Sequence, residues 1–111
     1  MKQNTIKEAF YNELQFGKKL LKENQFSKAF YHFENTHILG QKHLYRHTIS
    51  HFWLLFWAIK NQSVNEALGQ VLRILASVLF TLFWVPVGNT GGANVSAVKP
   101  MPIRKELQKY F

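Results

Sequence analysis

Two short polar segments divide this chain of 111 residues and limit what it can fold into. Residues 22–29 (KENQFSKA) and 60–67 (KNQSVNEA) align with each other, and each separates two runs in which apolar residues recur every three or four positions. That spacing is typical of amphipathic helices, and a repeated helix–turn–helix unit predicts stacked hairpins. We therefore predict an all-α fold with four main helices, at residues 4–22, 26–40, 42–60 and 63–84.

Each copy of the repeat carries a small alanine a few residues after its turn, at Ala29 and Ala67. This arrangement is similar to the tetratricopeptide repeat, in which a small residue lets two helices approach closely, although the offset here is longer than the usual period of about 34 residues. We thus expect two antiparallel tetratricopeptide-like hairpins.

Two apolar runs, His51–Ile59 and Ile74–Val87, raise the question of whether the chain contains a membrane-spanning helix. Each is shorter than the roughly 20 residues that a helix needs to cross a bilayer. We therefore predict that they are buried core helices, with Val71, Ile74 and Leu75 among the apolar positions of the fourth helix. A membrane-embedded hairpin or an oligomer interface is the alternative.

The last part of the chain differs in composition. Residues 86–102 are rich in Gly, Asn and Pro, which indicates an irregular segment that wraps over the hairpins. Residues 103–111 follow a proline and predict a short terminal helix. The chain is expected to form one domain, residues 1–111, in which residues 1–85 make the helical hairpins.

Composition excludes several classes of protein. The chain has no cysteine, which rules out disulfides, thiolate metal sites and thiol nucleophiles. Its net charge of +8 is spread over many positions without a recognisable motif, so no nucleic-acid partner is expected. The polar start of the chain does not resemble a signal peptide, and we predict a cytoplasmic location.

All five histidines lie between positions 32 and 51. His47 and His51 are four residues apart on one predicted helix, and Glu34 and His37 have the Glu-x-x-His spacing on the preceding one. A short turn at Gly40 would bring the two pairs together. Glu34, His37, His47 and His51 are therefore the predicted ligands of a divalent metal (Zn, Fe, Mn, Ni or Cu), with Gln41, Tyr31 and Tyr45 as supporting residues.

Other interpretations of the cluster stay open. The histidines could be structural, hydrogen-bonded in the core, or they could form a pH switch. No separate nucleophile or acid–base pair is evident, so we do not predict an enzyme. The alternative function is an interaction module that binds a peptide, a protein or a second copy of itself through aromatic helix faces. These faces comprise Phe52, Trp53, Phe56, Trp57, Phe80, Phe83 and Trp84.

Several short motifs point to a known family. They are HILGQ at 37–41, His47-x-x-x-His51, Gly69-Gln70, GNTGGANVS at 88–96 and Pro-Met-Pro at 100–102. From about Phe26 onward the chain resembles an uncharacterised bacterial family, domain of unknown function 3703. The resemblance implies a small bacterial cytoplasmic protein with no established activity. It also implies that the four predicted ligands matter more than His32 and His43.

Overall fold

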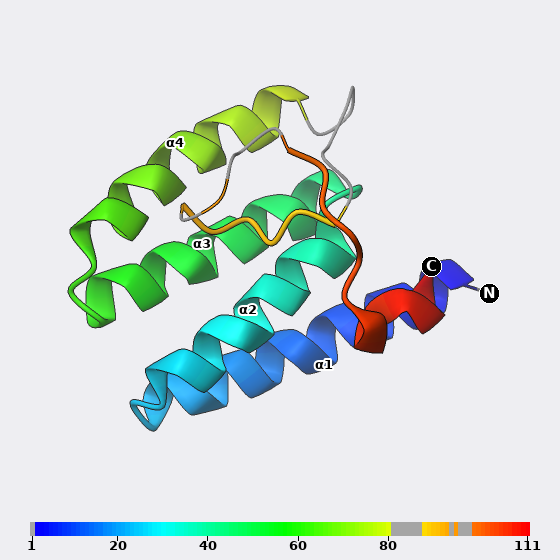
Figure 1. Cartoon of the computed structure of the whole chain (residues 1–111), viewed down its shortest axis with the longest axis horizontal. Helices are drawn as coiled ribbons and strands as arrows, with labels where there is room; N and C mark the ends of the chain where they lie inside the picture. Colours follow the sequence, from blue (N-terminus) through cyan, green and yellow to red (C-terminus); the bar gives the residue numbers. More distant parts are fainter. Residues whose placement is uncertain (1, 81–87, 94, 96–98) are drawn as a thin grey trace.

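The computed structural model describes residues 2–80, 88–93, 95 and 99–111, and within them the chain is helical without a β-strand. This confirms the predicted fold class. Four α-helices and one short 3₁₀ helix are present in the described ranges (Figure 1), and they are α1 (Lys2–Lys22), α2 (Phe26–Gly40), α3 (Leu44–Lys60), α4 (Val64–Phe80) and η1 (Lys105–Tyr110).

The helix boundaries follow the sequence closely, with a few differences. The first helix begins at Lys2, two residues before its predicted start. The third helix begins at Leu44 rather than at Lys42, because His43 is extended and its side chain caps the helix by accepting from the Arg46 amide. The described part of the fourth helix ends at Phe80, and the rest of its predicted range lies outside the described residues.

The two polar turns share one backbone structure. Asn24 and Gln62 are both in the left-handed region, at φ 59° and 57°. The next residue's amide reaches back five positions in both turns, from Gln25 to the Leu20 carbonyl (2.9 Å) and from Ser63 to the Ala58 carbonyl (2.8 Å). This is the Schellman arrangement that ends a helix. The sequence repeat is therefore also a structural repeat.

The helices pack as two hairpins joined through their inner members. α1 packs against α2, α3 packs against α4, and α2 packs against α3. Phe10, Phe33 and Leu54 are fully buried in the core between them. A Cβ on Gly17 would lie 2.6 Å from the Phe33 ring, so the missing side chain allows α1 and α2 to approach closely.

The end of the chain returns across the hairpins to α1 (Figure 1). η1 packs against α1, and Leu107 is buried in the main core. The predicted short terminal helix is thus present, in 3₁₀ form. Among the described residues, no helix is both long and apolar enough to cross a membrane.

Candidate metal centre

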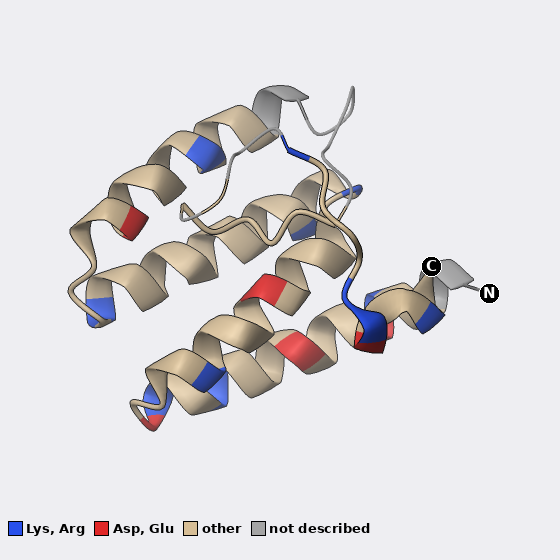
Figure 2. Cartoon of the chain, in the orientation of Figure 1, with Lys and Arg blue, Asp and Glu red and all other residues tan. Residues whose placement is uncertain are grey.

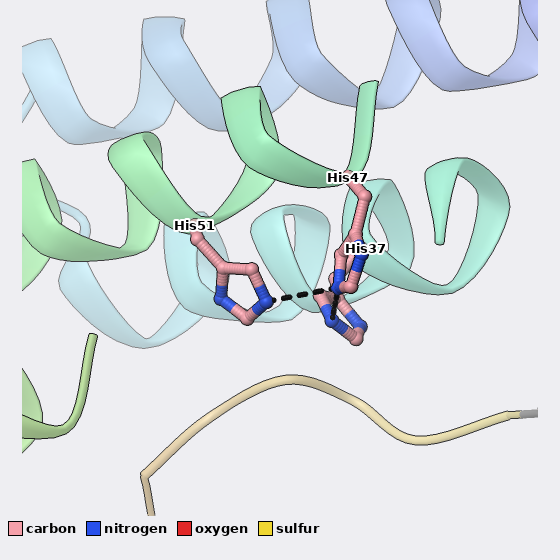
Figure 3. Close-up of side chains that lie close together, drawn as sticks. All are labelled: His37, His47 and His51. Carbon is pink, nitrogen blue, oxygen red and sulfur yellow. Dashed lines mark hydrogen bonds between the residues drawn. The ribbon is translucent and has the colours of Figure 1, made fainter. Parts of the chain in front are cut away.

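Three buried histidines meet between α2, α3 and residues 88–93, which we call the glycine-rich segment (Figure 3). His37 comes from the last turn of α2, whereas His47 and His51 lie one turn apart on α3. The Nε2 atom of His47 is 3.1 Å from Nε2 of His37 and 3.0 Å from Nε2 of His51. Ligand nitrogens of the three rings all lie within 4.8 Å of one another.

A hydrogen bond to the glycine-rich segment fixes which nitrogen of the His37 ring carries the hydrogen. Nδ1 of His37 lies 2.8 Å from the main-chain carbonyl oxygen of Asn89. A carbonyl can only accept, so Nδ1 carries the hydrogen and donates it. In the neutral ring, Nε2 then holds a lone pair directed towards the other two histidines.

The side-chain amide of Gln70 fixes which nitrogen of the His51 ring carries the hydrogen. Nδ1 of His51 lies 2.6 Å from Oε1 of Gln70. The Gln70 amide nitrogen donates to Oε2 of Glu66 (2.7 Å) and to the carbonyl of Gly91 (2.8 Å), and two acceptors around one nitrogen settle which way the amide points. His51 must therefore donate from Nδ1, and its Nε2 also presents a lone pair.

The three Nε2 atoms share few hydrogens. Whichever nitrogen of His47 carries its hydrogen, at most one hydrogen lies among them. Two of the atoms are acceptors, and a single N–H cannot align well with both at once. The three rings form a group that could hold a metal ion.

Burial keeps the three rings neutral. It lowers the pKa of His47 from its ordinary value near 6.5 to about 4. It also lowers the pKa of His51 to about 3, with a further contribution from the neighbouring His47. The pKa of His37 is well below its usual range, first through burial and then through repulsion from the other two rings. Neutral imidazoles are the form that binds metals.

The glycine-rich segment closes over the cluster. Gly91 adopts φ +83°, and a Cβ there would lie 2.5 Å from Cγ and Cδ2 of the His37 ring. Its amide donates to Oδ1 of Asn89 (2.8 Å), and its carbonyl accepts from Arg73 (3.2 Å) as well as from Gln70. Only glycine combines this backbone with such close contact to the ring.

Charged groups of both signs stand near the site. The Arg73 guanidinium contributes to the low pKa of His37 and His51, and it donates to the carbonyls of Gly91 and Val95. The Glu66 carboxylate accepts from the Ala93 amide at 2.8 Å. Burial lowers the pKa of the Arg73 guanidinium, and the negative charge of Glu66 opposes this effect.

The fourth predicted ligand is not part of this group. Oε1 of Glu34 lies 2.7 Å from Nη2 of Arg104, whose Nη1 donates to Oδ1 of Asn35, also at 2.7 Å. Burial raises the pKa of the Glu34 carboxyl, and Arg104 opposes this. Glu34 therefore anchors the returning C-terminal segment.

The remaining predicted residues have other environments. Nδ1 of His32 is 2.5 Å from Oε2 of Glu13, and His43 caps α3. The Tyr31 hydroxyl donates to Glu106, Tyr45 is 61% exposed, and Gln41 is buried. The sequence patterns alone gave no role in the site to Gln70 or Asn89. The motifs Gly69-Gln70 and 88–96 contain these two residues, but they indicated only a resemblance to a family.

Comparisons with known proteins agree with the resemblance. The family model described as "Protein of unknown function (DUF3703)" matches residues 4–111, which includes the first helix as well as the part expected from the motifs. No curated protein and no solved structure matches the chain significantly.

Proposed function

We propose that this chain, which belongs to the DUF3703 family, binds one divalent transition-metal ion through the Nε2 atoms of His37, His47 and His51. The observation that carries the proposal is the convergence of three Nε2 atoms, two of which have lone pairs fixed by hydrogen bonds on the far side of the ring. Two nitrogen ligands of a tetrahedral ion with bonds of 2.0–2.1 Å lie about 3.3 Å apart. The separations of 3.0 and 3.1 Å are close to that value.

The hydrogen bonds behind the rings support a metal site. Metal-binding histidines usually donate their other ring nitrogen to a carbonyl or carboxylate, which fixes the tautomer and the ring orientation. His37 does so to Asn89, and His51 does so to Gln70. A histidine that only fills space in a core has no need of a partner held in place by two further bonds.

The donor set narrows the choice of ion. Imidazole suits Zn, Cu, Fe and Ni, whereas Mn prefers carboxylate and water oxygens. Because Glu34 is held by Arg104, Mn becomes the least suitable of the five metals named above. We propose Zn²⁺ as the first candidate, with a fourth coordination position filled by water or a small ligand.

The test is a metal titration of the purified chain. Metal-free protein is titrated with Zn²⁺ by calorimetry and with Co²⁺ by visible absorption, where a tetrahedral site gives intense d–d bands. We expect one ion per chain and loss of binding in His47→Ala. The matched control is His43→Asn, one turn earlier and exposed, which keeps a side chain able to cap α3 and should bind as the wild type does.

Two outcomes would overturn the proposal. One is a wild-type chain that retains no stoichiometric metal while circular dichroism shows it to be folded. The other is a His47→Ala variant that binds with unchanged affinity. Either result would make the three rings a structural cluster.

The hydrogen-bonded support can be tested separately. Gln70→Leu keeps all three ligands but removes the acceptor that orients His51. Loss of such a partner typically lowers metal affinity by about 10- to 100-fold. Gln15→Leu, on an exposed position of α1, should have no effect. Equal affinities in the two variants would contradict the role given to Gln70.

A further inference from the structure

The amphipathic pattern of α4 is reversed. Its polar residues at positions 66, 70, 73 and 77 follow the 4-3-4 spacing of one helical face, and that face points into the protein. Glu66 accepts from Ala93, and Gln70 accepts from His51, as described above. Ser77 Oγ lies 3.0 Å from Thr48 Oγ1 on α3. The helix therefore uses its polar face to form the site.

The opposite face of α4 is apolar and exposed. It consists of aliphatic side chains that are 46–69% exposed, namely Val64, Leu68, Val71, Leu72 and Leu75. Four of them, at positions 64, 68, 71 and 75, follow a second 4-3-4 spacing, and we call these four the α4 seam. Spacing of this kind is that of the seam between two helices packed at a shallow angle.

The exposed apolar area continues onto α3. The contact between Thr48 and Ser77 places one flank of α3 beside α4. Phe52 and Ile59 follow Thr48 on that flank and are 40% and 61% exposed. With the α4 side chains they present roughly 700 Å² of apolar surface, which falls within the 600–1,000 Å² or so that each partner contributes to a standard interface.

The exposed face of α4 is compatible with a copy of the same chain. Each chain carries a net charge of +8, which opposes self-association, but none of the exposed aliphatic residues of α4 adds to that repulsion. The ribbon of α4 is tan along most of its length in Figure 2. Its two charged residues, Glu66 and Arg73, lie on the inward, polar face, where they bond to Ala93 and Val95. A two-fold axis through the seam would pair apolar residues with apolar residues over about 18 Å of helix.

A lipid surface fits this face less well. Helices that lie on membranes have Lys and Arg along a solvated polar face, where they meet anionic headgroups. The polar face of α4 is instead occupied by hydrogen bonds within the protein. We propose that α4 packs against α4 of a second copy of this chain through the α4 seam. This inference goes beyond the metal proposal and does not depend on it.

The first test is the mass in solution. Light scattering coupled to size exclusion, in buffer with EDTA so that metal bridging is absent, should give twice 13.0 kDa at high-micromolar concentration. Leu68→Glu, within the seam, should raise the dissociation constant by about a hundredfold or more, because a carboxylate would be buried without a partner. Phe16→Glu, a comparably exposed site on α1, is the matched control and should remain dimeric.

The second test uses the absence of cysteine in the chain. Single variants Leu68→Cys, Val71→Cys and Leu75→Cys should form a disulfide-linked dimer on mild oxidation at one or more of these positions. Phe16→Cys should not. This measurement stays informative if the glutamate variant fails to fold.

Three results would overturn the inference. They are a monomeric wild type at high concentration, a dimer that Leu68→Glu leaves intact, and a monomer that floats with phosphatidylcholine–phosphatidylglycerol vesicles. The last would assign the seam to a lipid surface.

Discussion

Acid should destabilise the metal-free protein well above the pH at which most carboxylates titrate. His47 and His51 have pKa values of about 4 and about 3 in the folded chain, against an ordinary value near 6.5 in the unfolded chain. Between these values the unfolded state binds more protons than the folded state. The free energy of unfolding must then fall as the pH falls.

The size of the effect follows from the shifts. At pH 5.5, one unit below the unfolded value, each imidazole contributes a loss of about 1.4 kcal/mol relative to pH 7.5. His47 and His51 together give about 3 kcal/mol, and His37, whose pKa is also well below 6.5, brings the total to about 4 kcal/mol. The comparison stops at pH 5.5 because the raised pKa of Glu34 acts in the opposite direction at lower pH.

Urea unfolding of EDTA-treated protein, followed by far-UV circular dichroism at several pH values, measures this change. His47→Gln should reduce the pH dependence by about one third, whatever it does to the absolute stability, since one of three buried imidazoles is gone. His43→Gln, on an exposed position, should leave the dependence as in the wild type. A wild-type stability that stays constant from pH 7.5 to 5.5 would refute the reasoning, because the rings would then not be buried and neutral.

Three further predictions concern the surroundings of the cluster. Gly91→Ala should lower the free energy of unfolding by about 2–3 kcal/mol, because of backbone strain and a collision with the His37 ring. A variant that unfolds at the same urea concentration as the wild type would contradict the described loop. Arg104→Ala should lower the free energy of unfolding by about 2 kcal/mol, because it leaves the Glu34 carboxylate unpaired. Adding Glu34→Gln should recover part of this loss. A double variant less stable than Arg104→Ala alone would argue against the ion pair. Zn²⁺ at a hundredfold excess over its dissociation constant should stabilise the wild type by about 2.7 kcal/mol, and EDTA should reverse this; equal unfolding curves with and without the ion would count against binding.

The elements of this fold were predictable because their signals are local. The helices follow from three- and four-residue spacing, and the turns at Asn24 and Gln62 follow from a repeat visible in the letters. The meeting of His37 with His47 was also predictable, since a short turn at Gly40 brings the end of α2 near the start of α3. These relations all connect residues that are close in the sequence.

The features that were not predictable depend on distant contacts. Glu34 has the spacing of a ligand, but its partner Arg104 lies 70 residues away, and nothing in the spacing reveals that competitor. The apolar run Ile74–Val87 was predicted to be part of a buried core helix, and this is wrong for Leu75, which is exposed. Periodicity shows that a helix has two faces, but here the polar face turned inward because the site it supports is itself polar.

The predicted aromatic faces divide between core and surface. Trp53 and Trp57 pack against the core, and the Trp57 indole donates to the Phe26 carbonyl at 2.8 Å. Phe52 and Phe56 are exposed. The side chains of Phe80, Phe83 and Trp84 lie outside the described part of the chain.

The hydrogen bonds that fix the tautomers of His37 and His51 have a consequence for the order in which the site forms during synthesis. The three rings are close in the sequence, but Gln70 follows His51 by 19 residues and Asn89 follows His37 by 52. During synthesis from the N-terminus, α2 and α3 leave the ribosome before the groups that orient their rings. The lone pairs would thus converge only after the glycine-rich segment has docked. An ion would then bind only to chains that have completed folding.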